Sequence, residues 1–131
     1  MVAYGGTEMK RIWIGIGFLV VLLVAGLVVM KMMDRQLGEI SNNLEQAAQS
    51  TIWEQSVALA KEAEKGWRSK KKLFTALTDH SRIDAIEALF ASLEIYRQWK
   101  NETEYALTCV QLAEAVHALE ENHRLVWYNL L

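Results

Sequence analysis

The sequence predicts an all-α protein with one N-terminal transmembrane helix that continues into a stalk, followed by an antiparallel bundle of three to four helices. Three observations indicate this fold class. An apolar run of nineteen residues without a charged side chain lies at 12–30. The 131 residues contain no proline, and only Gly38 and Gly66 follow the run. The alternating runs flanked by turn residues that are typical of strands are missing.

The apolar run 12–30 is long enough to cross a bilayer as a helix. At a rise of ~1.5 Å per residue it spans roughly 28 Å, about the thickness of the hydrocarbon core. A cleaved signal peptide is the first competing interpretation, but its apolar core is shorter and ends at a small-residue cleavage site, which is absent from 30–34. A buried core helix that is apolar on all sides would require a larger protein to cover it. We therefore expect an uncleaved anchor.

The charges that flank the run give a weak signal for orientation. Lys10 and Arg11 precede it and Lys31 and Arg35 follow it, so the count of basic residues is a tie. A short basic tail before an apolar core is the arrangement of a signal-anchor. We therefore expect the N-terminus inside the cell and the C-terminal part outside it, at the cell membrane.

The predicted domain organisation follows the chain from the tail to the bundle. A short tail covers 1–11 and the transmembrane anchor covers 12–33. The stalk helix covers 34–50, and the helical bundle domain covers 51–131.

Capping patterns place the starts of three helices after the stalk. An N-cap side chain accepts a hydrogen bond from a free backbone N–H, and an acidic residue three positions later reaches back to the cap. Thr51 and Asn101 each have a Glu three positions later, and Ser81 has an Asp. We therefore predict helices at about 52–78, 82–99 and 102–129.

Apolar residues repeat at intervals of three and four along each predicted helix, as they do in helices that pack at a shallow angle. The stalk carries Met33, Leu37, Ile40, Leu44 and Ala47. The next helix carries Trp53, Val57, Ala60, Glu64, Trp67, Lys71 and Phe74. The third carries Ile83, Ile86, Leu89, Phe90, Leu93 and Tyr96. The last carries Tyr105, Cys109, Leu112, Val116, Leu119, His123, Val126 and Leu130. The short connections at 78–81 and 100–102 make neighbouring helices antiparallel.

Composition excludes several classes of function. Residues 34–131 carry eleven Lys and Arg against fifteen Asp and Glu, a net charge of −4. This acidic balance argues against a nucleic-acid partner, because proteins that bind nucleic acids present a basic surface. A single cysteine, Cys109, excludes an internal disulfide and a multi-cysteine metal site. We find no nucleophile motif and no glycine-rich phosphate loop, so we expect neither an enzyme nor a bound cofactor.

Histidines offer two candidate sites, and each has a plain structural reading. Glu-x-x-His occurs at 114–117 and 120–123, a spacing used by di-iron bundles, but both copies lie on one helix about 240° apart. His80 lies between Asp79 and Asp84, where a carboxylate could orient an imidazole for proton transfer or metal binding. The favoured interpretation is a structural turn formed by Asp79, His80 and Asp84, with no metal site.

Two groups of residues are candidates for a partner surface. The dense basic run is Arg68, Lys70, Lys71 and Lys72. It could meet anionic lipid headgroups or form a solvated helix face. Trp99 and Trp127 lie near predicted helix ends, where an exposed indole is typical of an interface. The anchor has no pair of small residues four apart, so nothing in it indicates tight dimerisation, and the oligomeric state stays open.

Short motifs along the chain carry a resemblance to a known family. Trp53 and Trp67 are fourteen residues apart, residues 80–86 read His-Ser-Arg-Ile-Asp-Ala-Ile, and residues 127–131 read Trp-Tyr-Asn-Leu-Leu. The chain resembles an uncharacterised family of short single-pass membrane proteins from clostridia and related Gram-positive bacteria, which shows His-x-x-Ile-Asp-x-Ile and ends in Asn-Ile-Leu. The resemblance implies a membrane location and a helical bundle, and it implies no activity. Residues 98–100 read Gln-Trp-Lys where the family usually has an acidic residue, so no role at that turn is carried over.

The sequence therefore predicts a membrane-anchored helical interaction or structural module. Its partners are the lipid bilayer and a membrane protein. The alternative is an extracytoplasmic ligand-sensing bundle that acts through a partner membrane protein. A metal-dependent enzyme is a third interpretation, disfavoured because the ligand geometry is missing.

Overall fold

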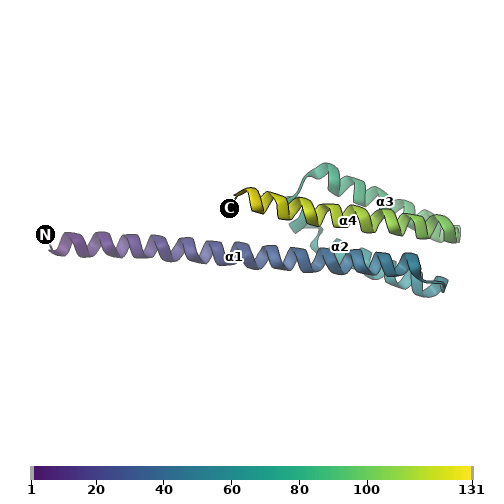
Figure 1. Cartoon of the computed structure of the whole chain (residues 1–131), viewed down its shortest axis with the longest axis horizontal. Coiled ribbons are helices and arrows are strands. Elements are labelled where there is room, and N and C mark those ends of the chain that lie inside the picture. The colour runs from purple at the N-terminus through teal and green to yellow at the C-terminus, as the bar shows by residue number, and fades with distance from the viewer. Residues whose placement is uncertain (1, 131) are drawn as a thin grey trace. The chain divides into compact units, whose positions relative to one another are not determined.

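The computed structural model describes the backbone of residues 2–130 and the side chains of 8–122 apart from Leu77. Four helices follow one another, α1 (Val2–Gln49), α2 (Trp53–Leu77), α3 (His80–Gln98) and α4 (Glu102–Leu130), and residues 2–130 contain no strand (Figure 1). The predicted all-α class is thus confirmed, and the predicted helix ends after the stalk agree within two residues. The chain divides into two compact units, Met1–Met32 and Met33–Leu131.

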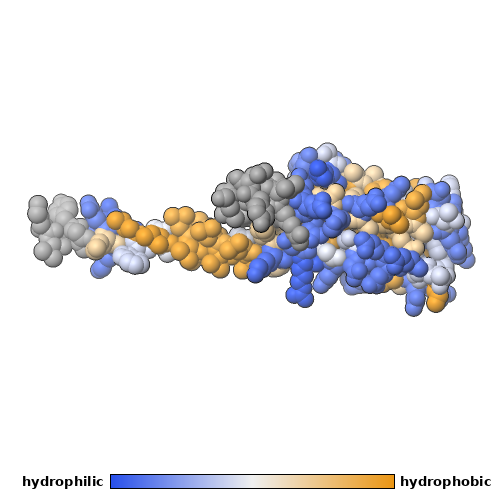
Figure 2. All heavy atoms as spheres, viewed as in Figure 1, coloured by the Kyte–Doolittle hydropathy of each residue, from blue (hydrophilic) through white to orange (hydrophobic). Residues whose placement is uncertain are grey.

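The first unit is a helix whose described side chains are mostly exposed. An 18-residue window of α1 has a mean hydropathy of 2.9, and none of it is buried. Its apolar side chains are exposed, from Ile12 at 59 % to Val29 at 37 % (orange in Figure 2). In the described part of the chain, α1 is the one helix long and apolar enough to span a membrane.

The second unit is a four-helix bundle, because the stalk is its first helix. Every residue of the predicted stalk stripe is buried: Met33, Leu37, Ile40, Leu44 and Ala47. The predicted division at 50–51 between a stalk and a bundle therefore does not correspond to a boundary in the packing. The four helices run alternately up and down, joined by short connections at 50–52, 78–79 and 99–101 (Figure 1).

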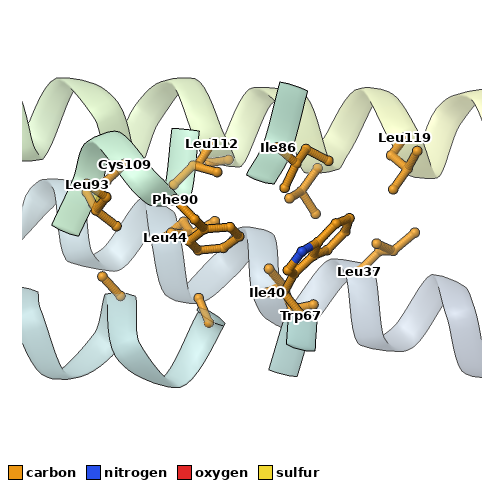
Figure 3. Close-up of a cluster of buried hydrophobic side chains, with 14 of the residues drawn as sticks. Leu37, Ile40, Leu44, Trp67, Ile86, Phe90, Leu93, Cys109, Leu112 and Leu119 are labelled. Atoms are coloured by element: carbon orange, nitrogen blue, oxygen red, sulfur yellow. The ribbon is translucent and has the colours of Figure 1, made fainter. Parts of the chain in front are cut away.

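The core of the bundle is built by apolar side chains from all four helices. Figure 3 shows Leu37 and Leu44 of α1, Trp67 of α2, Phe90 of α3 and Leu112 of α4 pointing toward one another. Leu37, Leu44 and Leu112 have no exposed surface. The predicted stripes of α3 and α4 are confirmed over the described side chains, with Leu89 and Tyr96 at the edge of the core.

Small residues of α2 bring it close to α1. A Cβ on Gly66 would lie 3.3 Å from Cγ1 of Ile40, so the glycine leaves the space that the isoleucine fills. Ten residues before Gly66 on α2, the buried Ser56 hydroxyl donates to the Ala47 carbonyl oxygen of α1 at 2.6 Å. These two contacts fix the antiparallel register of α1 and α2.

Two predicted helix starts differ from the structure. The residue before α2 is Ile52, which has extended backbone angles and makes no side-chain cap, so the Thr51 cap prediction was wrong. A serine turn occupies this position, because Ser50 Oγ accepts a bond from the Ile52 N–H at 3.4 Å. In front of α3 the N-cap is Asp79 in place of Ser81, because the helix begins two residues earlier than predicted.

The α3–α4 connection is a Schellman turn with a residue other than glycine in the left-handed conformation. Lys100 has φ 52° and donates to the Arg97 carbonyl, while the Asn101 N–H bonds to the Tyr96 carbonyl at 3.0 Å. The Asn101 side chain then accepts from the Glu104 N–H at 3.3 Å, so the predicted N-cap of α4 is confirmed.

Lys100→Gly is expected to stabilise the protein by about 0.5–1 kcal/mol, because glycine adopts a positive φ without the steric cost of a Cβ. Thermal unfolding of the purified protein in detergent micelles, followed by circular dichroism, measures the change. The control is Ala91→Gly at an exposed position inside α3, which should destabilise by about 1 kcal/mol. A loss of stability in both variants would contradict the proposed strain at Lys100.

Candidate functional site

The turn between α3 and α4 presents two large apolar side chains to solvent. Trp99, the C-cap of α3, is 73 % exposed. Ile95 lies one turn earlier on the same face and is 48 % exposed. The other predicted partner residue, Trp127, lies outside the described side chains. In the described part of the bundle, the Trp99 turn is therefore the candidate partner surface.

The predicted basic run is divided by ion pairs. Arg68 donates to Glu64 Oε1 at 2.7 Å, and this bond raises the pKa of the guanidinium. Lys71 Nζ lies 3.3 Å from Glu87 Oε1. Lys70 and Lys72 form no ion pair with any described side chain. Only two of the four predicted residues therefore remain available for a partner.

Glu87 of α3 binds two side chains of α2, and the sequence analysis did not predict these contacts. The indole Nε1 of Trp67, which is 1 % exposed, donates to Glu87 Oε1 at 2.8 Å, and the same oxygen pairs with Lys71. Burial tends to raise the pKa of Glu87, but the hydrogen bonds from Trp67 and Lys71 outweigh it and lower the pKa overall. One feature of the sequence could have indicated these contacts. Glu87 follows Ile83 by four residues and precedes Phe90 by three, which places it at the edge of the apolar stripe of α3.

Glu87→Gln is expected to reduce stability at neutral pH, with the deficit disappearing in acid. Because the folded-state pKa of Glu87 is lowered from 4.5, its contribution is complete above that value and is lost as the pH falls through the folded-state pKa. Unfolding free energies from pH 7 to pH 3 measure this. Glu62→Gln, at an exposed position on α2, serves as the control and should differ from the parent by a constant amount. A Glu87→Gln deficit that persists unchanged at pH 3 would contradict the assignment.

The turn before α3 is held by Asp79. Its carboxylate accepts bonds from the Ser81 N–H at 3.2 Å and from the Ser81 hydroxyl at 3.0 Å. These bonds lower the pKa of Asp79, and the nearby charge of Arg82 lowers it further. His80 and Asp84 are exposed, and the described hydrogen bonds of the turn include neither side chain.

Asp79→Ala is expected to lower the midpoint of thermal unfolding by a few degrees, because the first turn of α3 loses its cap. His80→Ala should leave the midpoint unchanged, since surface changes away from such a feature have small effects. Scanning calorimetry or circular dichroism of both variants gives the comparison. An effect of His80→Ala as large as that of Asp79→Ala would restore a structural role for the imidazole.

The Glu-x-x-His residues do not converge. His117 is largely exposed and pairs with Glu120 at 3.7 Å and with Glu121 at 3.4 Å, one turn farther along the same helix. Glu114 is exposed, and the His123 side chain lies outside the described residues. Among the side chains that the structure describes, no group of three His, Cys, Asp or Glu is arranged to hold a metal ion.

Comparison with known protein families shows which family the chain matches. A family model described as a domain of unknown function, DUF4363, matches residues 28–130. The chain belongs to the DUF4363 family. No curated protein and no solved structure matches the chain.

The DUF4363 match covers α2, α3, α4 and the part of α1 that enters the bundle. It begins two residues before the end of the apolar run at Met30, so most of that run lies outside the match. The family therefore characterises the four-helix bundle. The family model assigns no activity, and the resemblance described from the sequence implies none either.

Two further features of the DUF4363 bundle bear on its chemistry. Cys109 has no exposed surface, and burial raises its pKa to about 12, so its thiol is unreactive in the folded protein. A groove of about 210 Å³ lies between α1 and α4, with Ala48 and Ala113 among its lining residues and Glu45 and Glu114 exposed beside them. It is smaller than the ~300–1,000 Å³ typical of small-molecule sites.

Proposed function

We propose that this DUF4363 protein is a single-pass membrane protein whose bundle is a non-enzymatic interaction or structural module outside the cell membrane. The exposed apolar helix carries the proposal. Soluble monomers rarely expose contiguous apolar patches larger than a few hundred Å². Burying a single valine, leucine, isoleucine, phenylalanine or methionine side chain is worth ~1.5–3 kcal/mol. The run 12–30 contains fourteen of these residues, so a bilayer would stabilise this helix strongly.

The bundle supports the module part of the proposal. Its core is filled by apolar side chains from four helices, and described charged groups outside the core form ion pairs or a helix cap, such as Lys71 with Glu87 and the Asp79 cap. Among the described side chains of the bundle, Trp99 is the most exposed large apolar one, and Ile95 lies beside it. Tryptophan is enriched at interface hot spots, so a membrane-protein partner would bind at the Trp99 turn. The groove between α1 and α4 offers less support for the alternative, a ligand-sensing bundle.

The basic tail supports the orientation. Lys10 and Arg11 precede the apolar run, which is the arrangement of a signal-anchor, and the resemblance to short single-pass membrane proteins of Gram-positive bacteria supports the membrane location. The resemblance thus supports the proposed cell-membrane location, and the basic tail supports the proposed outward-facing bundle.

A cysteine placed after Leu131, in a Cys109→Ser background, tests the orientation. It is expected to react with a membrane-impermeant maleimide in intact cells, while the parent protein with its buried Cys109 stays unlabelled. Extraction of membranes at alkaline pH tests the anchor, and the protein should remain in the membrane pellet. Labelling only after lysis would reverse the orientation, and release into the supernatant would refute the anchor.

Photo-crosslinking in membranes tests the partner surface. A photoreactive residue in place of Trp99 should give a discrete adduct with one membrane protein, and the same residue in place of the exposed Glu62 should not. Equal patterns from the two positions would contradict a partner site at the Trp99 turn. A metal-dependent enzyme would instead show a stoichiometric bound metal in the purified protein.

A further inference from the structure

One end of the bundle is joined directly to the apolar run. Met33 is the first residue of the bundle unit, and it follows Met30, the last residue of the run, by three positions of one continuous helix. Three residues of helix measure roughly 5 Å. If the run is anchored in a bilayer, as proposed above, the Met33 end of the bundle lies next to the headgroups at any tilt.

The free lysines of α2 lie at this same end. Because Gly66 is level with Ile40 and the two helices are antiparallel, residues after Gly66 approach Met33. Lys70 and Lys72 follow Gly66 by four and six residues, roughly 6 and 9 Å. Met33 precedes Ile40 by seven residues, roughly 10 Å. Both lysines therefore lie within about one helical turn of the Met33 end.

Arg82 adds a third charge at this end. α3 begins where α2 ends, and Arg82 is exposed in its first turn. Lys71 of α2 pairs with Glu87 of α3, which fixes the level of the two helices. Arg82 precedes Glu87 by five residues, so it lies roughly 7 Å nearer to the Met33 end. We name Lys70, Lys72 and Arg82 the basic rim.

The rim carries positive charge on an otherwise acidic bundle. None of its three side chains forms an ion pair with a described residue, although Arg82 lies near Asp79, whose carboxylate caps α3. Acidic residues lie at both ends of the bundle: Asp79 and Asp84 flank Arg82 at the rim, and Glu45, Glu54, Glu94, Glu102 and Glu104 lie at the opposite end. A negatively charged membrane surface would attract the rim and repel the acidic residues of the far end.

We propose that the basic rim binds anionic lipid headgroups of the membrane in which the apolar run is anchored. This proposal depends on the proposed membrane anchoring. Each basic residue near an anionic surface contributes to the attraction, which decays within a Debye length of about 8–10 Å. The rim residues lie within that range of the Met33 end of the bundle. Acidic macromolecules in solution fit less well, because the rest of the bundle would repel them.

Lysine acetylation of the full-length protein in lipid nanodiscs tests the proposal by mass spectrometry. One set of discs contains only zwitterionic phosphatidylcholine, and the other contains phosphatidylglycerol as well. Acetylation of Lys70 and Lys72 is expected to be roughly fivefold slower in the anionic discs. The exposed lysines Lys61, Lys65 and Lys100 should react equally in both discs, and high salt should abolish the difference at the rim.

Variants and a second anion sharpen the test. Arg82→Gln should weaken the protection of Lys70 and Lys72, whereas Lys100→Gln, with the same change of charge at the far end, should not. Inorganic phosphate added to the neutral discs should leave all rates unchanged, and protection by phosphate alone would overturn the lipid assignment. Equal acetylation rates in both discs, or uniform slowing of every lysine, would refute the proposal that the basic rim binds anionic lipid headgroups. Failure of the protein to enter the discs would instead refute the anchoring.

Discussion

Trp67→Ala is expected to destabilise the bundle by about 3–5 kcal/mol, the range for removing a large buried aromatic side chain. The indole is 1 % exposed, and its ring centroid lies 5.3 Å from that of Phe74 and 6.3 Å from that of Phe90. The change would leave a cavity between these rings and remove the bond from Nε1 to Glu87. Chemical unfolding in detergent micelles, followed by circular dichroism, measures the free energy.

Trp99→Ala is the matched control, because it removes the same side chain from a position that is 73 % exposed. Its expected effect is within about 0.5 kcal/mol. Trp67→Phe separates packing from hydrogen bonding, since it keeps an aromatic ring but leaves Glu87 with Lys71 alone. A Trp99→Ala variant as unstable as Trp67→Ala would mean that the wrong tryptophan has been placed in the core.

The positions of the helices could be predicted from the sequence because the signals are local. The Asn101 cap and the spacing of Met33, Leu37 and Ile40 each depend on one helix alone. The Thr51 prediction was wrong for a related reason: a capping pattern does not show that the backbone at Ile52 is extended, which delays the helix start to Trp53.

The side of α2 that faces the core could not be predicted as well. The predicted stripe included Glu64 and Lys71, whereas the structure buries Ser56 and Ala63, two small residues that the pattern passed over. They are buried because α1 approaches α2 closely on the side of Gly66. Such an approach depends on the neighbouring helix, which the periodicity of α2 does not contain.

The candidate site shows the same limit. Exposure of Trp99 followed from its place at a helix end, so the sequence could indicate it. The sequence could not predict that Lys71 pairs with Glu87 while Lys72 forms no ion pair with a described residue. Both outcomes depend on how α3 is rotated against α2. The basic rim likewise became visible only when the register of α1, α2 and α3 was known.

Leu112→Ala is expected to cost about 2–5 kcal/mol, because it removes buried contacts and leaves a cavity in the middle of the core. Leu112 has no exposed surface and lies among side chains that include Leu44 of α1 and Phe90 of α3 (Figure 3). Domains of this size have ~5–15 kcal/mol of stability, so the loss would lower the melting temperature visibly.

Glu114→Ala is the control on the same helix, two residues away and exposed beside the groove between α1 and α4. Its expected cost is below about 0.5 kcal/mol, as for most surface changes. The large ratio between the two effects would show that α4 turns its Cys109, Leu112 and Val116 face inward. A reversed order would mean that Glu114 faces the core. The carboxylate would then need a buried partner, and the Glu-x-x-His spacing to His117 would again be a candidate metal site.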